Sequence, residues 1–299
     1  MQDRYDTVLI GGSGFIGTHL SHYLTESGER VLSISRHLPD QPIPGIDSVA
    51  IDFSDPTSAK EFSLPSCQSV IILIGQVGPG FDPNKDREAL SAVISVINAY
   101  GGSLKVLYAS TALVYGNCEA PAHESDPLRP IEPYAVHKAE NESLLKKSID
   151  PRHSLAILRL SNIFGDIRSR GFISLLVRSL QEPGRSIGKF IVNGDGKQER
   201  DYLFIDDLVA AFLAVKSRLA GSDIINISSG ESRTLLSVIE AVRQVSGKQV
   251  DFDLNNQPIN EAQVIRVSNK HLAEVYGFTP QLSFKEGVAE MWQRSSRTV

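Results

Sequence analysis

The residues with the clearest chemical potential are a tyrosine and a lysine four positions apart, Tyr134 and Lys138. They fall in Pro133–Ser148, a stretch rich in helix formers, so the spacing predicts both side chains on one helix face. An ammonium beside a phenol favours the phenolate and lowers the phenol pKa from about 10 towards neutrality. We therefore predict that Tyr134 exchanges a proton with a substrate hydroxyl or carbonyl. The alternative is an exposed helical pair without a chemical role.

A second polar group ends an apolar stretch upstream of this pair. Residues 104–110 are mostly apolar and predict a strand that runs into Ser110 and Thr111. A hydroxyl at the end of this strand would hold the substrate oxygen from the side opposite Tyr134. Either Ser110 or Thr111 fits this part of the chemistry.

A glycine-spaced turn, Gly11 to Gly17, follows the apolar run Thr7–Ile10 near the start of the chain. A strand, a glycine turn and a helix together form the arrangement that a dinucleotide pyrophosphate requires. Gly11 allows the tight turn, Gly14 lets the backbone approach the phosphates, and Gly17 lets the helix pack close to the sheet. The alternative is a glycine-rich turn of an unrelated α/β protein. The predicted cofactor contacts here are Gly11, Ser13, Gly14, Phe15, Ile16 and Gly17.

The residues about twenty positions after the glycines indicate which dinucleotide binds. This place holds Ser35 and Arg36 and no carboxylate, whereas an acidic residue there takes the ribose 2′-hydroxyl of NAD. Arg36 can grip a 2′-phosphate, which favours NADP(H) over NAD(H). Alternatively, Arg36 solvates a loop and Ser35 takes an unphosphorylated ribose. Asp52 either accepts a hydrogen bond from the adenine amino group or caps the turn that it begins.

The first half of the chain alternates between strand and helix patterns. This alternation predicts right-handed βαβ units and a parallel, doubly wound α/β sheet. After about residue 166 the alternation becomes irregular, which indicates a second lobe. The predicted strands are 8–10, 30–35, 48–52, 69–75, 104–110 and 155–160, and the predicted helices are 18–27, 88–100 and 133–148.

The composition excludes several other classes of protein. The chain has 299 residues and a net charge of −5 without a basic cluster, which argues against nucleic acid as a partner. It has no apolar run of membrane-spanning length and no signal-peptide pattern at its start, so we expect a cytoplasmic protein. Cys67 and Cys118 are too few for a disulfide framework or a metal cluster, and no metal site is expected.

In this order along the chain, the motifs resemble the extended short-chain dehydrogenases/reductases of the NAD(P)-dependent sugar-nucleotide epimerase/dehydratase type. The glycine turn fits the family's Gly-x-x-Gly-x-x-Gly, and Tyr134 and Lys138 fit its catalytic pair. Counting back from Val-Tyr-Gly at 114–116, the family's catalytic Ser/Thr falls on Thr111, with Ser110 beside it at the substrate. The resemblance covers nearly the whole chain.

The resemblance also implies the domains and the partner. It implies a Rossmann domain over 1–165, to which 202–230 return, and a smaller, mixed α/β substrate lobe made of 166–201 and 231–299. In this family the helices matching 88–100 and 133–148 form a four-helix interface of a homodimer. An apolar stripe on the first helix fits this interface, although burial against the chain's own sheet explains it equally well. The stripe consists of Ala92, Val93, Val96 and Ile97.

Two further motifs resemble the family's contacts to the substrate diphosphate. Residues 158–165 resemble Arg-x-x-Asn-x-Tyr-Gly and assign the diphosphate contact to Asn162. Residues 194–207 resemble Gly-x-Gly-x-x-x-Arg-Asp-Tyr-x-x-Val-x-Asp, whose arginine binds phosphate, and this implicates Arg200. The alternative is that Arg200 and Asp201 only hold a hairpin together.

The chain departs from the family at the second phosphate arginine, where it has Asn260. The nearby Arg266 is the candidate to replace it. The small-residue stretch after the fourth strand matches Ile74, Gly75 and Gln76, and we expect these residues to face the nicotinamide or the substrate.

A third departure from the family limits the reactions that we expect the chain to catalyse. Dehydratases of this type carry Asp-Glu after the catalytic threonine, where this chain has Ala112 and Leu113, so sugar dehydration is not expected. Because cells keep NADP largely reduced, Arg36 favours reduction of a keto group, at C4 in our prediction, of a nucleotide-linked sugar. A 4-epimerase is the alternative, and a non-catalytic dinucleotide sensor a more distant one. In either enzyme Tyr134 moves the proton, while Lys138 supports Tyr134 and the cofactor ribose.

Overall fold

The computed structural model describes residues 4–39, 41–75, 81–181, 190–255, 257 and 260–296, and these form two compact units. The first unit comprises Met1–Thr111, Pro133–Arg159 and Phe212–Ile225, and the second comprises Ala112–Glu132, Leu160–Ala211 and Asn226–Val299. The structural division therefore differs from the predicted domain boundaries, since residues 112–132 and 160–165 belong to the second unit and only 212–225 of the predicted 202–230 return to the first. The reason is strand pairing: β6 (Cys118–Ala122) pairs with β14 (Ile265–Val267), far along the chain.

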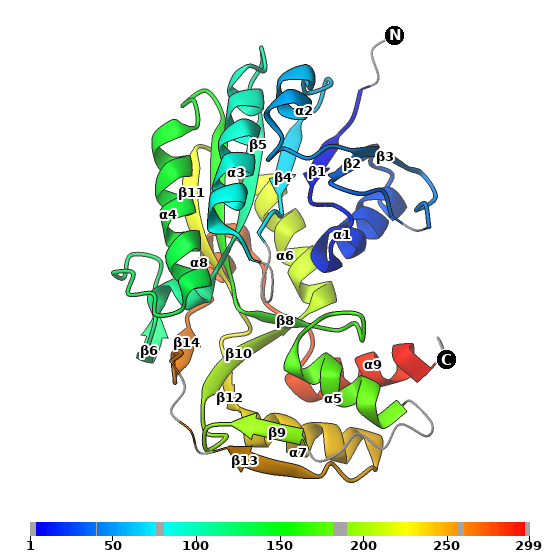
Figure 1. Cartoon of the computed structure of the whole chain (residues 1–299), viewed down its shortest axis with the longest axis vertical. Helices are drawn as coiled ribbons and strands as arrows, with labels where there is room; N and C mark the ends of the chain where they lie inside the picture. The colour runs from blue at the N-terminus through cyan, green and yellow to red at the C-terminus, as the bar shows by residue number, and fades with distance from the viewer. Residues whose placement is uncertain are drawn as a thin grey trace. The chain divides into compact units, whose positions relative to one another are not determined.

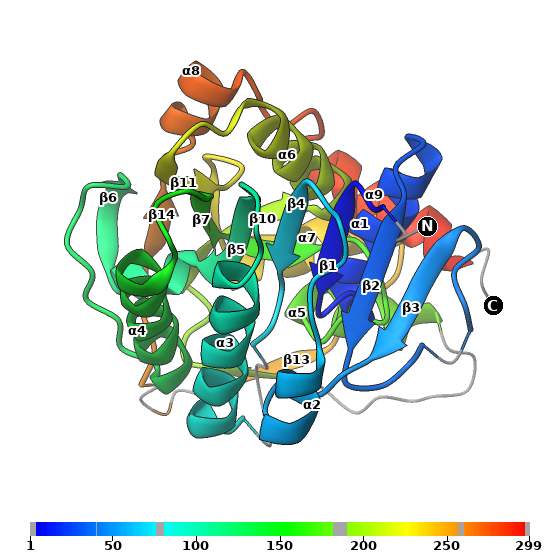
Figure 2. The ribbon, with the colours of Figure 1, turned by 90° about the horizontal axis from the view of Figure 1, so that it is seen from above.

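The first unit is built on a seven-stranded sheet in the order β11-β7-β5-β4-β1-β2-β3 (Figure 2). All pairs from β5 to β3 are parallel. The strand order reverses between β1 and β4, and the doubly wound parallel sheet predicted from the sequence is confirmed. The strands are β1 (Thr7–Ile10), β2 (Val31–Ser35), β3 (Ile46–Ala50), β4 (Ser69–Ile72), β5 (Lys105–Thr111), β7 (Ser154–Leu160) and β11 (Ser222–Ile227).

Helices cover both faces of this sheet (Figures 1 and 2). Helices α2 (Pro56–Glu61), α3 (Pro83–Asn98) and α4 (Pro133–Ser148) lie on one face, and α1 (Phe15–Glu26) lies on the other. Sheets covered on both faces have continuously apolar strands. All four residues of β1 are accordingly buried, and so are all four of β4.

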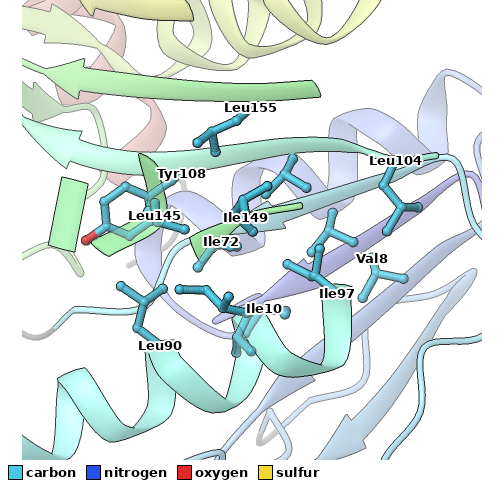
Figure 3. Packing of buried hydrophobic residues seen from close by; sticks show 14 of the residues in the cluster. Val8, Ile10, Ile72, Leu90, Ile97, Leu104, Tyr108, Leu145, Ile149 and Leu155 are labelled. Atoms are coloured by element: carbon cyan, nitrogen blue, oxygen red, sulfur yellow. The ribbon is translucent and has the colours of Figure 1, made fainter. Parts of the chain in front are cut away.

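The core of the first unit fills the space between the sheet and helices α3 and α4 (Figure 3). Val8, Ile72, Leu90 and Ile97 are completely buried there. Of the apolar stripe on α3, Val93 and Ile97 belong to this core, and Ala92 and Val96 pack against it. The stripe therefore packs at least in part against the chain's own sheet, and the homodimer stays a prediction.

The second unit contains three small sheets, in the orders β12-β10-β8, β13-β9 and β14-β6. They are a mixed set, with antiparallel pairing of β10 and β12 and parallel pairing of β8 and β10. The remaining elements are η1 (Ala112–Tyr115), β8 (Asn162–Phe164), α5 (Phe172–Gln181), β9 (Phe190–Asn193), β10 (Glu199–Phe204), α6 (Ile205–Arg218), β12 (Ser232–Thr234), α7 (Leu235–Ser246), β13 (Phe252–Asn255), α8 (Lys270–Tyr276) and α9 (Phe284–Ser296). Among the described helices, none combines the length and the apolarity needed to cross a membrane.

Candidate active site

The glycine turn has the shape of a phosphate cradle at the amino end of α1. Gly11 has a φ of +89°, and a Cβ on Gly17 would lie 2.6 Å from the Cα of Gly12, so the helix packs against the turn without room for a side chain. Gly14 differs, since a Cβ there would meet only the carbonyl oxygen of Gly11, at 3.3 Å. No side chain caps the helix at Gly14. An exposed glycine before an uncapped helix start fits the approach of a pyrophosphate.

Replacing Gly17 by alanine tests this packing. The new Cβ would meet backbone atoms of Gly11 and Gly12 at 2.6–2.7 Å, and forced overpacking of this kind costs about 1–3 kcal/mol. We expect the free energy of unfolding in urea to fall by that amount, and the dinucleotide to bind more weakly. Gly101→Ala is the matched control, because a Cβ at Gly101 meets nothing within 4 Å. Equal stability of the two variants would contradict this account of the turn.

The end of β2 holds the residues predicted to select the dinucleotide. The buried Ser35 accepts a hydrogen bond from the backbone N–H of Ser13 at 2.9 Å, which ties the end of β2 to the glycine turn. Arg36 is exposed. Asp52 accepts hydrogen bonds from the Oγ and the N–H of Ser54 at 2.7 and 2.9 Å, and the first of these is the main cause that lowers the pKa of Asp52. Of the two roles considered for Asp52, the structure shows turn capping.

Lys138 is buried in the first unit, and polar groups surround its ammonium. Its Nζ donates to the carbonyl oxygens of Ile74 and Ala109 at 3.0 and 2.9 Å, and to the Oη of Tyr108 at 3.1 Å. These three acceptors match the three N–H groups of an ammonium. A Cβ on Gly75 would lie 2.6 Å from this Nζ, so Gly75 packs directly against the Lys138 side chain. Gln76 lies outside the described residues.

The surroundings of Tyr134 shift its pKa in the direction opposite to the prediction that Lys138 lowers it. Burial raises the pKa of Tyr134, and the Asp86 carboxylate raises it further. Lys138 does not offset these two effects, since its Nζ lies 5.9 Å from the Tyr134 ring centroid and donates to the three acceptors named above. The Tyr134 ring makes an edge contact with Phe81 at 6.0 Å between centroids.

The two hydroxyls at the end of β5 have different surroundings. Ser110 donates to Oε1 of Glu142 at 2.6 Å, and both residues are buried. Glu142 also accepts from Nε and Nη2 of Arg159 at 3.1 and 2.9 Å, forming an ion pair removed from water. Because the Ser110 hydroxyl is committed to Glu142, its predicted contact with a substrate is not supported, and Thr111 stands as the candidate. The following Ala112 and Leu113 form the start of η1 and offer no proton-transfer group.

The predicted phosphate ligands belong to the second unit, and they differ in burial and in their contacts. Asn162 is exposed at the first position of β8. Arg200 is buried on β10, where its Nη1 donates to the carbonyl oxygen of Glu199 at 2.9 Å and its Nη2 lies 3.7 Å from Oε1 of Glu261. Asp201 accepts hydrogen bonds from the backbone N–H groups of Ser229 and Gly230, both at 2.8 Å. Asp201 thus holds a turn, which is one of the roles considered from the sequence. The contact of the Arg200 guanidinium with the Glu261 carboxylate is long, at 3.7 Å.

Arg266, the predicted replacement phosphate ligand, is paired with a carboxylate of its own chain. Its Nε and Nη2 contact both carboxylate oxygens of Glu199 at 2.8 and 2.9 Å, and its Nη1 donates to the carbonyl oxygen of Glu119 at 2.6 Å. This bidentate pairing lowers the pKa of Glu199. That Arg266 replaces the arginine missing at Asn260 stays a prediction, and in this structure Arg266 neutralises a carboxylate of its own chain.

Sequence reasoning missed a group of polar residues behind Lys138. His137 is buried, and its Nε2 lies 2.7 Å from Oδ2 of Asp86. The buried Asn141 donates to the same oxygen at 3.1 Å. The signal in the sequence is periodicity, because His137 and Asn141 repeat the four-residue spacing of Tyr134 and Lys138. Within the described part of the chain, no group of three or more His, Cys, Asp or Glu residues could hold a metal ion.

Comparison with known proteins agrees with this geometry. The sequence model of the family described as "NAD dependent epimerase/dehydratase family" matches residues 7–228, well over half of the chain. The chain belongs to this family. It is thus an enzyme of the NAD(P)-dependent, extended short-chain dehydrogenase/reductase type.

Similar members of the epimerase/dehydratase family differ in their reactions. The chain is 27% identical to a UDP-glucose 4-epimerase of Neisseria gonorrhoeae and 29% identical to a dTDP-4-dehydro-6-deoxyglucose reductase of Escherichia coli. Both alignments cover 97% of this chain and 98% of the relative. The fold matches the UDP-glucose 4-epimerase of Thermus thermophilus solved in complex with NAD, with a TM-score of 0.83 and 21% identity over 98% of this chain and 100% of that one.

Proposed function

We propose that the protein reduces a keto group, at C4, of a nucleotide-linked sugar, with NADP(H) as the preferred cofactor and Tyr134 as the proton donor. The observation that supports the proposal is the position of Tyr134 and Lys138 one turn apart on α4, where the buried Lys138 donates to Ile74, Ala109 and Tyr108 and burial raises the pKa of the Tyr134 phenol. A neutral phenol is an acid, and reduction of a ketone requires an acid at the carbonyl oxygen.

The residues of the first unit fit a dinucleotide. The glycine turn and the start of α1 would hold the pyrophosphate, Ser35 and Arg36 the adenine ribose and its 2′-phosphate, and Lys138 the second ribose. When bound, the reduced nicotinamide supplies a hydride to the carbonyl carbon. Tyr134 donates its proton to the carbonyl oxygen, so the ketone gains two electrons and becomes an alcohol. Thr111 polarises the same oxygen.

The NADP preference of this proposal depends on Arg36. Hydrogen bonds to charged groups contribute about 1.5–3 kcal/mol, so we expect Arg36→Ala to raise the Kd for NADPH about 10–100-fold. The Kd for NADH should change little, because NADH lacks the 2′-phosphate. Fluorescence titration with both dinucleotides measures the effect, with the exposed neighbour His37→Ala as the control. An equal loss of affinity for NADH would show that Arg36 does not read the 2′-phosphate.

A 4-epimerase is the second candidate, and its support is the similarity to UDP-glucose 4-epimerases at nearly the same identity as to the reductase. Two observations weigh against a tight epimerase-like grip on a diphosphate: Asn260 lacks a charge, and Arg266 is paired with Glu199. The proposed diphosphate contacts are therefore Asn162 and Arg200.

Turnover with a panel of nucleotide sugars separates the two functions. A reductase consumes NADPH with a 4-keto nucleotide sugar, mole for mole. A purified protein that carries bound NAD, interconverts 4-epimers and consumes no NADPH with any 4-keto sugar would overturn the reductase proposal.

A further inference from the structure

A connected set of buried polar groups leads from Lys138 to a carboxylate on a neighbouring helix. Lys138 donates to the Oη of Tyr108, which also accepts from Nδ2 of Asn141 at 3.3 Å. Asn141 donates in turn to Oδ2 of Asp86, 3.1 Å away on α3. Tyr108, Lys138 and Asn141 are each at most 2% exposed, and the Asp86 side chain is 11% exposed.

Asp86 is held in place by two residues of α4 rather than by solvent. His137 contacts the same Oδ2 at 2.7 Å, and the His137 ring makes an edge contact with Phe81 at 5.3 Å. Phe81 also contacts the Tyr134 ring. One carboxylate is thus connected to Lys138 through Asn141 and Tyr108, and to the surroundings of Tyr134 through His137 and Phe81.

We propose that Asp86 is a positioning residue for the catalytic pair: through Asn141 and Tyr108 it orients the Lys138 ammonium, and its charge keeps that ammonium protonated in a site removed from water. The proposal rests on the proposed function only in taking Tyr134 and Lys138 as the reacting pair.

Two carboxylates act on the Lys138 ammonium, and Asp86 is the one that we assign to compensate its charge. Burial lowers the pKa of Lys138 to about 8, and the carboxylates of Asp86 and Glu142 oppose this effect. Glu142 is already neutralised by Arg159 and bonded to Ser110. Tyr108 stays a neutral phenol, since burial raises its pKa.

His137 also contacts the Asp86 carboxylate through its imidazole. The same carboxylate oxygen still accepts the hydrogen bond from Asn141 that leads to Lys138. Asp86 therefore supplies the negative charge that compensates the Lys138 ammonium.

Titration of Lys138 in the ligand-free protein tests the proposal directly. With lysine labelled at the ε-carbon, the NMR resonance that disappears in Lys138→Met reports the Lys138 pKa. We expect about 8 in the parent, and a value lower by at least about one unit in Asp86→Asn, as for the loss of a nearby opposite charge. Glu88→Gln is the matched control, because Glu88 is exposed on the same helix and loses the same charge. An unchanged pKa in Asp86→Asn, or an equal shift in Glu88→Gln, would overturn the proposal.

Tyr108→Phe keeps the proposal testable if Asp86→Asn does not fold. It retains the buried ring but removes the hydroxyl that joins Lys138 to Asn141, so the Lys138 pKa should fall in the same direction. An unchanged pKa would contradict the proposed connection. Because the titration uses no substrate, its result is independent of turnover: the proposed function fails if Tyr134→Phe keeps its reductase activity, whatever Lys138 does.

Discussion

Replacing Tyr134 by phenylalanine is expected to lower kcat for keto-sugar reduction about 10²–10⁴-fold, the range typical for loss of a positioned acid. The ring and its edge contact with Phe81 are retained, so the change removes a proton donor and little packing. The Kd for NADPH should stay close to that of the parent, because the phosphate cradle lies at the amino end of α1 and is not altered. Stopped-flow absorbance of NADPH gives the rate, and fluorescence titration gives the Kd.

Tyr23→Phe is the matched control, since it removes a phenol that is 45% exposed on α1. Its kcat should equal that of the parent. Substantial reductase activity in Tyr134→Phe, with the control unaffected, would exclude Tyr134 as the proton donor.

The second large effect is expected at the buried ion pair of Glu142 and Arg159. Removing one partner of a buried pair leaves an uncompensated charge and costs about 3–5 kcal/mol, and the two side chains here are 0% and 2% exposed. We therefore expect Arg159→Met to lower the free energy of unfolding by about that amount, as measured by urea denaturation at pH 7.

The double variant Glu142→Gln/Arg159→Met should recover part of this loss, because neither charge is then left without its partner. Ser110 would keep a hydrogen-bond acceptor in the glutamine. If Arg159→Met lost less than about 1 kcal/mol, the pair would behave like an exposed salt bridge, and the assignment of Ser110 and Glu142 to the interior would be wrong.

The sequence was most informative where spacing along one element determines the geometry. The four-residue interval of Tyr134 and Lys138 predicted two residues one turn apart, and α4 has the predicted bounds. The apolar run before Gly11 predicted β1 and the turn. Two helix starts were missed although the sequence carries their signal: Asp55-Pro56 begins α2 and Asp82-Pro83 begins α3, with each aspartate accepting hydrogen bonds from the first-turn N–H groups.

The electrostatics of the site depend on pairings between distant segments, and these were not predictable from local patterns. Asp86 meets His137 and Asn141 only because α3 packs beside α4. Arg266 meets Glu199 across 67 positions of the chain, a pairing that neither local sequence predicts. The Tyr134 pKa was misjudged for a related reason, because burial of the phenol and the Asp86 carboxylate of another helix raise it, and the four-residue spacing reports neither.

The most direct test of the central claim is the fate of deuterium from NADPH deuterated at C4 of the nicotinamide, followed by mass spectrometry of the sugar product. If the protein is a keto-sugar reductase, each NADPH consumed leaves one deuterium on the reduced sugar carbon, and Tyr134→Phe loses this transfer. An unlabelled 4-epimer formed without net loss of NADPH would contradict the reductase account and identify the epimerase.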